Sequence, residues 1–231
     1  MTIPLVGGVP AISAHQMRRV DEIMIDQLGI DLPRMMENAG LQLAALARRR
    51  YRFDTVAILA GSGGNGGGGL VAARHLANRG VTVTVTTGRP PGVMTEVPRR
   101  QYDILERMGV RITDEPEAAD LVIDALIGYS LTGDPRGRAA DLIAWANGQP
   151  APVLALDVPS GLDATTGRVG DPCVVADATL TLALPKTGLE AAPHIVGALY
   201  LADISVHRSV YREMGVDLVD PFSAGPIVRL R

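Results

Sequence analysis

Carboxylate, amide and hydroxyl side chains stand at three points of the chain where a short apolar run ends. Asp124 ends the run LVID, Asp157 follows VLAL with Ser160 three residues later, and Asn65 lies in a glycine-rich segment after TVAILA. Asn65, Asp124 and Ser160 offer hard, oxygen-type ligands, which suit an alkali or alkaline-earth cation better than zinc. Asp157 adds a proton-transfer group beside them.

The glycine-rich segment, residues 61–69, has seven glycines in nine positions and is expected to precede a helix. Glycine lets backbone N–H groups approach a ligand, and a helix N-terminus favours negative charge, so a phosphate cradle is expected; the alternative is an empty surface loop. Gly61, Gly63 and Gly66 match G-x-G-x-x-G, but the first carboxylate after them is Glu96. A nicotinamide dehydrogenase would have a carboxylate about 20 residues after the glycine motif to bind a ribose hydroxyl, so that class of enzyme is disfavoured.

Lys186 is the only lysine of the chain, whose other basic residues are arginine. Its compact ammonium could polarise a leaving oxygen or simply pair with a structural carboxylate. The single cysteine, Cys173, cannot form an internal disulfide and is expected to be a small buried hydrophobe. The four histidines lack the i, i+4 spacing of a metal-binding helix.

Composition narrows the class of protein. The 231 residues carry 22 Lys+Arg against 25 Asp+Glu, a net charge of −3, which disfavours a nucleic-acid reader that works by bulk positive charge. The sequence has neither an apolar run of roughly 18 residues nor a basic-flanked leader, so no membrane association is expected. We therefore expect a cytoplasmic protein.

Two helices are expected before the first strand, forming an N-terminal extension over about residues 12–51. Ser13 suits the N-cap of the first helix, whose apolar residues recur at helical spacing up to Gly29. Pro33 suits the opening turn of the second helix. Apolar residues of the second helix could bury against the sheet or against a partner subunit.

From residue 54 to about 206, apolar runs alternate with helical stretches, which predicts a mostly parallel sheet with helices on both faces. The chain, residues 1–231, is therefore expected to be a single three-layer α/β/α domain. Its ligands should lie beyond the carboxyl ends of the strands. The expected strands are 55–60, 81–85, 121–128, 152–158, 178–184 and 198–204, with helices at 70–79, 96–108 and 136–147.

Taken together, these motifs resemble one family, the NAD(P)H-hydrate epimerases, or YjeF N-terminal domains. The resemblance spans residues 12 to about 205 and implies a Rossmann-like sandwich with helices before the first strand. The matching segments, in the family's order, are Met36–Gly40, the glycine segment through Leu76, Asp124–Gly128, Asp157–Asp163, Asp177–Thr179 and Pro185–Gly188.

The resemblance implies an isomerase for damaged dinucleotides, NADHX and NADPHX, which carry a hydroxyl at C6 of the nicotinamide ring. Family members interconvert the R and S epimers so that a separate S-specific dehydratase can restore the coenzyme. Family likeness also suggests a homodimer. It implies catalytic roles for Asp157 and Lys186 and a potassium ion held by Asn65, Asp124 and Ser160. The implied substrate-binding residues are Gly64, Asn65, Gly66, Gly67, Gly68, Gly128, Tyr129, Ser130, Leu131, Thr132, Gly133, Asp134 and Asp157.

A chemical hypothesis follows from the substrate. Asp157 protonates the departing C6 hydroxyl while the ring nitrogen expels it, and water re-enters the iminium from either face; ring opening to an aldehyde is the alternative. Where family members usually read N-N-G-G-D-G, residues 64–69 of this chain read G-N-G-G-G-G, so one asparagine and one carboxylate are absent. The family's G-x-G is G-Y-S at residues 128–130. These changes remove polar contacts to the substrate. The rival functions are therefore a non-catalytic nucleotide-binding or scaffold module and, more distantly, a nicotinamide oxidoreductase.

Overall fold

Eight strands form one sheet in the computed structural model, which describes residues 2–231. Their order is β3-β2-β1-β4-β5-β6-β7-β8, and every neighbouring pair is parallel except β7 and β8. The order reverses between β1 and β4, as in Rossmann-like folds. The strands are β1 Thr55–Ala60, β2 Thr82–Thr87, β3 Arg111–Thr113, β4 Leu121–Ala125, β5 Val153–Leu156, β6 Ala178–Leu182, β7 Ala198–Ala202 and β8 Ile227–Arg229.

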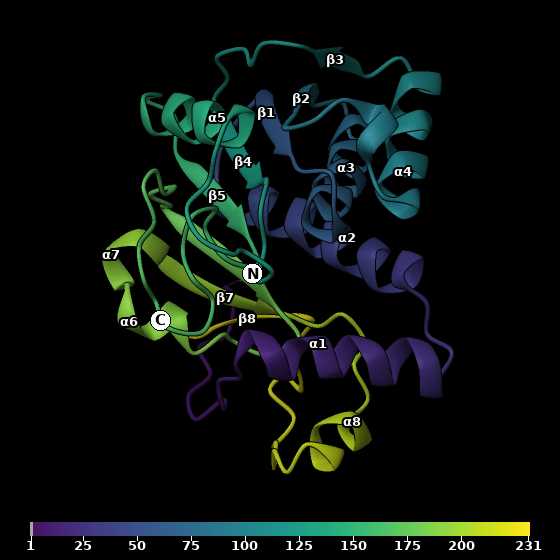
Figure 1. Ribbon diagram of the computed structural model, residues 1–231, viewed down its shortest axis with the longest axis vertical. Helices are drawn as coiled ribbons and strands as arrows, with labels where there is room; N and C mark the ends of the chain where they lie inside the picture. The colour runs from purple at the N-terminus through teal and green to yellow at the C-terminus, as the bar shows by residue number, and fades with distance from the viewer. Residues whose placement is uncertain (1) are drawn as a thin grey trace.

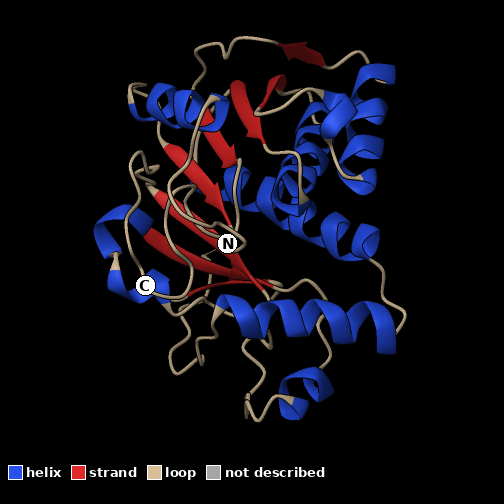
Figure 2. Ribbon diagram, viewed as in Figure 1, coloured by secondary structure: helices blue, strands red, loops and turns tan. Residues whose placement is uncertain are grey.

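Helices cover both faces of the sheet (Figures 1 and 2). On one face lie α2, α3 and α4, and on the other α5, α6 and α7, so the protein has three layers. The helices are α1 Ala14–Glu22, the π-helical turn η1 Ile23–Gln27, α2 Leu32–Arg50, α3 Gly64–Ala77, the short 3-10 turn η2 Pro91–Val93, α4 Glu96–Arg107, α5 Arg138–Asn147, α6 Gly188–Ala191, α7 Pro193–Val196 and α8 Arg208–Glu213.

Side chains alternate between the two layers along each central strand. In β1, Val56, Ile58 and Ala60 pack beneath α2, α3 and α4, whereas Leu59 packs beneath α5. This is the period of two that a strand imposes, and burial on both faces explains why the central strands read as continuous apolar runs. The same alternation in β4 turns Asp124 towards the α5 side of the sheet.

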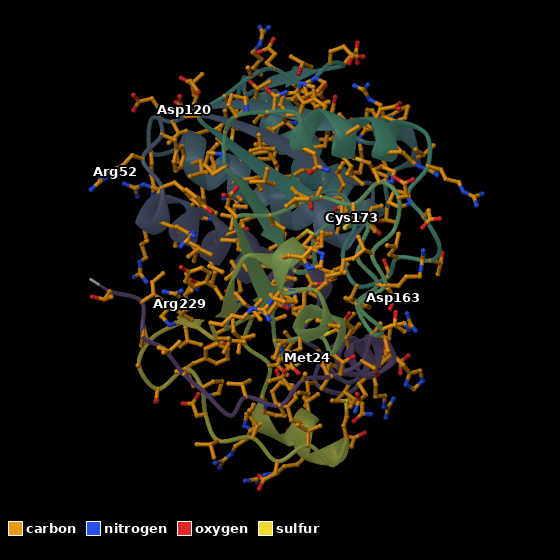
Figure 3. All side chains as sticks on the ribbon, turned by 90° about the vertical axis from the view of Figure 1, so that its left-hand side faces the viewer. Met24, Arg52, Asp120, Asp163, Cys173 and Arg229 are labelled. Carbon is orange, nitrogen blue, oxygen red and sulfur yellow. The ribbon has the colours of Figure 1, made fainter. Side chains whose placement is uncertain are left out.

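The first helix lies beyond the carboxyl ends of β6 and β7. Met17 and Val20 of α1, with Met24 of η1, pack against residues that follow those strands. These residues include Leu184 and Ile204. Figure 3 shows Asp120, which directly precedes β4, near the top of the molecule and Met24 in its lower half. The N-terminal extension therefore covers the edge of the sheet at which ligands are expected.

The sequence-based expectation of a mostly parallel α/β sandwich is confirmed. Ser13 caps α1 with a reciprocal Gln16 contact, and Asp31 caps α2 with Pro33 in its first turn. Two short edge strands, β3 and β8, were not expected, and β8 extends the sheet past residue 206. Three residues are too few to show a period of two, so the sequence gives no signal for either strand.

The start of α3 corrects another expectation. The sequence suggested that residues 61–69 form a loop before a helix at Leu70, but the helix begins at Gly64. Glycine has a low intrinsic helix propensity, which tertiary packing overrides here. Among residues 2–231, none of the helices combines the length and apolar character needed to cross a bilayer.

Candidate active site

A buried ion pair joins the loops that follow β5 and β6. Lys186 Nζ lies 2.5 Å from Asp157 Oδ1, and the two side chains are 0% and 5% exposed. Lys186 also donates to the Leu182 carbonyl at 2.9 Å. The sequence left open whether Lys186 acts on a leaving oxygen or pairs with a carboxylate; it pairs with the proposed catalytic carboxylate itself.

The backbone around this pair is held in an unusual conformation. Asp157 has a φ of +66°, which a non-glycine residue seldom adopts, and its N–H donates to the Leu180 carbonyl. The N-terminal arm fixes the other partner, because Ile12 bonds through its backbone to the residues on either side of Lys186. Backbone strain of this kind persists where the surroundings over-determine it, and it is frequent at functional sites.

The ion pair borders a cavity of about 310 Å³ between α1, the start of α2 and the carboxyl edge of the sheet. Asp157 and Lys186 form its polar floor, and methionines of α1 and α2 form its apolar wall. An apolar pocket with a few convergent polar groups is the usual form of a small-molecule site. The residues implied by the sequence that line it are Gly64, Asn65, Gly68, Gly128, Tyr129, Ser130, Asp157 and Lys186.

Tyr129 links the floor of this cavity to α1. Its backbone N–H donates to Asp157 Oδ2 at 3.2 Å, and its hydroxyl donates to Asp21 Oδ2 at 2.5 Å. Burial raises the pKa of Asp21 despite the opposing hydrogen bond from Tyr129, and burial together with the Asp21 charge raises the pKa of Tyr129. Asp21 was not among the residues predicted from the sequence, although its position four residues after Met17 places a carboxylate on the apolar stripe of the helix.

Asp124 and Ser160 lie together behind the cavity, and both are fully buried. Asp124 accepts hydrogen bonds from the Ser160 hydroxyl at 2.6 Å, the Ser160 N–H at 2.8 Å and the Leu126 N–H at 3.1 Å. All three donors are neutral, and burial raises the pKa of Asp124 to about 6. A cation beside the carboxylate would offset that cost of burying its charge.

Asn65 approaches the same cluster from the first turn of α3. A Cβ on Gly128 would stand 3.2 Å from Asn65 Cγ, so the two residues are in close contact. Gly128 directly follows Ile127, whose N–H donates to Ser160 Oγ at 2.8 Å. Asn65 Nδ2 is buried without a hydrogen-bond partner among the described residues. The structure therefore places the three residues of the expected cation site along one continuous set of contacts.

The glycines of α3 divide into two groups. A Cβ on Gly66 would overlap the Gly61 carbonyl, and one on Gly67 would overlap the Met36 side chain, so these glycines permit close packing and line neither cavity. Gly64 is exposed at the helix start. Backbone N–H groups in the first turn of a helix lie outside its hydrogen-bond ladder, and α3 has no side-chain cap. That turn is therefore suited to an anion.

A second cavity, of about 910 Å³, lies on the other side of the α3 start. It is lined by residues that follow β1, β2 and β4, and Ser130 borders both cavities. Of the remaining residues implied by the sequence, Leu131, Thr132 and Asp134 line this larger cavity, whereas Gly133 lies in the same loop but not on its wall. The two cavities meet at Ser130, and the residues at the start of α3, whose N-terminus favours negative charge, lie between them.

The fold and the site define a class: a Rossmann-like protein with two neighbouring cavities at the carboxyl edge of its sheet, next to the point where the strand order reverses. More specifically, the chain belongs to the family described as YjeF-related protein N-terminus, which matches residues 33–188.

Several relatives match almost the whole chain. A protein of Dehalogenimonas lykanthroporepellens named NAD(P)H-hydrate epimerase is 45% identical, over 96% of this chain and 94% of its own length. A protein of the same name from Truepera radiovictrix is 37% identical over 92% and 96% of the two chains. A crystal structure of the yeast protein YNL200c has the same fold, with a TM-score of 0.84, 24% identity and coverage of 96% of this chain and 100% of that chain.

Some relatives are much longer than this chain. The bifunctional NAD(P)H-hydrate repair enzyme Nnr of Salinibacter ruber is 34% identical over 85% of this chain, but the match covers 41% of its own length. The shared part therefore corresponds to less than half of that larger enzyme.

Proposed function

We propose that this chain is an NAD(P)H-hydrate epimerase that interconverts the R and S forms of NADHX and NADPHX. The observation that carries the proposal is the buried pair of Asp157 and Lys186 at the floor of an apolar cavity large enough for a nicotinamide ring. The names of the full-length relatives support the same activity. The uncapped start of α3, whose free N–H groups suit an anion, supports a ligand that carries a pyrophosphate.

The chemistry requires a proton at one atom of the substrate, the C6 hydroxyl oxygen. C6 also carries the ring nitrogen, whose lone pair expels the hydroxyl as water and leaves an iminium. Water then adds to either face of C6 and releases one proton, so the proton taken from the protein is returned. A group that gives and takes this proton at one position serves both halves of the reaction.

Asp157 and Lys186 supply that group as a unit. Asp157 lines the cavity, its Oδ1 is bound to the Lys186 ammonium at 2.5 Å, and its Oδ2 accepts the Tyr129 N–H at 3.2 Å. A proton that passes from Nζ to the carboxylate gives a neutral acid at the cavity wall, and it passes back when the added water is deprotonated. This arrangement refines the hypothesis that Asp157 acts alone, because it names the source of its proton. The apolar methionine wall limits competing water.

The cation site fits potassium by its donor set. Asp124 is a buried carboxylate whose hydrogen-bond partners are all neutral, and Asn65 brings an amide oxygen, a hard donor, to the same cluster. Asn65, Asp124 and Ser160 would hold the ion through oxygen atoms. A bound alkali ion would offset the Asp124 charge and fix the start of α3 against the Gly128 loop. Potassium is thus proposed as the single cofactor.

Further expectations concern partners and location. A separate dehydratase would consume the S epimer, as the repair enzyme of Salinibacter ruber suggests by its name and length. A homodimer and a cytoplasmic location stay predictions. Of the apolar residues of α2 that could have faced a partner subunit, Met35, Met36 and Leu46 are buried within the chain itself, whereas Leu41 is half-buried.

The test starts from a purified R epimer of NADPHX. The protein is added in potassium buffer and in a matched buffer of a large organic cation, and the two epimers are followed by chromatography. We expect conversion towards an equilibrium mixture that is faster with potassium. Binding without conversion would support the scaffold alternative, and hydride transfer to an added acceptor would support the oxidoreductase.

A further inference from the structure

The larger cavity lies where a Rossmann-like sheet receives the adenosine half of a dinucleotide. Its walls come from the carboxyl ends of β1, β2 and β4, on both sides of the point where the strand order reverses. In such folds the end of the second strand faces the adenosine ribose. A carboxylate there binds the 2′-hydroxyl, whereas a nearby arginine accommodates a 2′-phosphate.

The end of β2 carries an arginine and lacks a carboxylate. From Thr82 to Thr95 the sequence contains no Asp or Glu, and β2 ends at Thr87, directly before Gly88 and Arg89. Arg89 is exposed and lines the larger cavity. A free 2′-hydroxyl would therefore lack its usual acceptor, while an anion in its place would meet a guanidinium.

Two of the other charged side chains around the cavity are already paired. Asp134 is bound by Arg168 at 2.8 Å, and Arg138 is bound to Glu115 at 3.2 Å. Arg89 and Arg136 also line the cavity, and neither takes part in an ion pair within residues 2–231. The cavity thus presents unpaired positive charge at the ribose end, beyond what a pyrophosphate at the α3 start requires.

We propose that this cavity contains a subsite for a ribose 2′-phosphate, that Arg89 is its main ligand, and that the chain prefers NADPHX to NADHX. The guanidinium can donate two parallel hydrogen bonds to phosphate oxygens, a geometry that lysine does not offer. The identity of the reacting end rests on the proposed function. The 2′-phosphate subsite itself rests only on the cavity and its charges.

Two probes without a nicotinamide ring test the subsite directly: ADP-ribose and its 2′-phosphorylated form. Isothermal titration at one fixed ionic strength should give an affinity at least about tenfold higher for the phosphorylated probe, as expected for a charge-assisted hydrogen bond to phosphate. Arg89→Gln should remove most of that difference. Arg138→Gln is the matched control, because it removes the same charge from the same cavity at a side chain already held by Glu115.

Equal affinities of the wild type for the two probes would overturn the subsite, and so would a preference that survives in Arg89→Gln. A preference lost in Arg136→Gln but kept in Arg89→Gln would overturn the assignment to Arg89. Because neither probe can be epimerised, an inactive epimerase that still discriminates between them would contradict the proposed function and leave the subsite standing. A protein that epimerises NADPHX but binds the two probes equally would support the proposed function and overturn the subsite.

Discussion

Replacing Lys186 by methionine tests the buried pair at the centre of the site. The thioether keeps most of the length and apolar volume of the lysine side chain but removes the ammonium. Asp157 then loses its 2.5 Å partner and keeps only the Tyr129 N–H at 3.2 Å. A carboxylate that is 5% exposed cannot recover that loss from water.

The expected cost is about 3–5 kcal/mol, the range found when one partner of a buried ion pair is removed. For a chain of this size the loss corresponds to a fall in melting temperature on the order of 10 °C. The loss of stability in Lys186→Met should increase with pH. Without the ammonium, burial favours the protonated carboxyl in the folded state, so the folded variant binds a proton that the unfolded chain releases. The loss should therefore be largest near pH 8 and smaller near pH 5.

Urea unfolding at both pH values measures this loss. A second variant, Asp157→Asn with Lys186→Met, should regain much of the stability because it leaves no buried charge. Arg100→Met is the control: its pair with Glu96 has the same 2.5 Å separation but is 67% and 74% exposed, so it should cost at most about 1 kcal/mol. A loss below 1 kcal/mol in Lys186→Met, or one that is equal at both pH values, would refute the reasoning.

Three further predictions concern neighbouring residues. In Gly128→Ala the new Cβ lies 3.2 Å from Asn65 Cγ, so Asn65 must move, and turnover of the R epimer should fall about tenfold or more; an unchanged rate would contradict this. Burial and a nearby carboxylate raise the pKa of Cys173 to about 12, so iodoacetamide should label it at pH 8 only after unfolding, and rapid labelling of the native protein would be the contrary result. Tyr129→Phe should lower the free energy of unfolding in urea by about 1 kcal/mol. The loss should be larger at pH 8 than at pH 5, because the Tyr129 hydroxyl stabilises the ionised form of Asp21, whose pKa burial raises. Equal losses at the two pH values would argue against this role of the hydroxyl.

The sequence predicted the parts of the site that follow strands. Asp124 lies near the end of a recognisable apolar run, Asp157 and Ser160 follow another, and parallel strands bring such positions to one edge of a sheet. It could not decide the role of Lys186, because pairing depends on which loop faces which. Asp21 was missed for a similar reason: its partner Tyr129 lies 108 positions away, and only the helical position of Asp21 hinted at a buried role.

The fold was predictable where local pattern and tertiary packing agree. The strand TVAILA was predicted with its observed bounds, Thr55–Ala60. The start of α3 was not, because its glycines disfavour a helix locally yet are required by the close approach of α2. A Cβ on Gly40 of α2 would overlap Val71 of α3, and one on Gly67 would overlap Met36. Contacts between segments decide such positions, and a single sequence does not display them.

The central claim is that the Asp157 carboxyl moves the proton at C6. The most direct measurement is the rate at which the Asp157→Asn variant converts a purified R epimer of NADPHX, alongside its affinity for NADP⁺. We predict a fall in turnover of about 10²- to 10⁴-fold, the usual contribution of a general acid–base group, with an affinity close to that of the wild type. Turnover within a few-fold of the wild type would contradict the account.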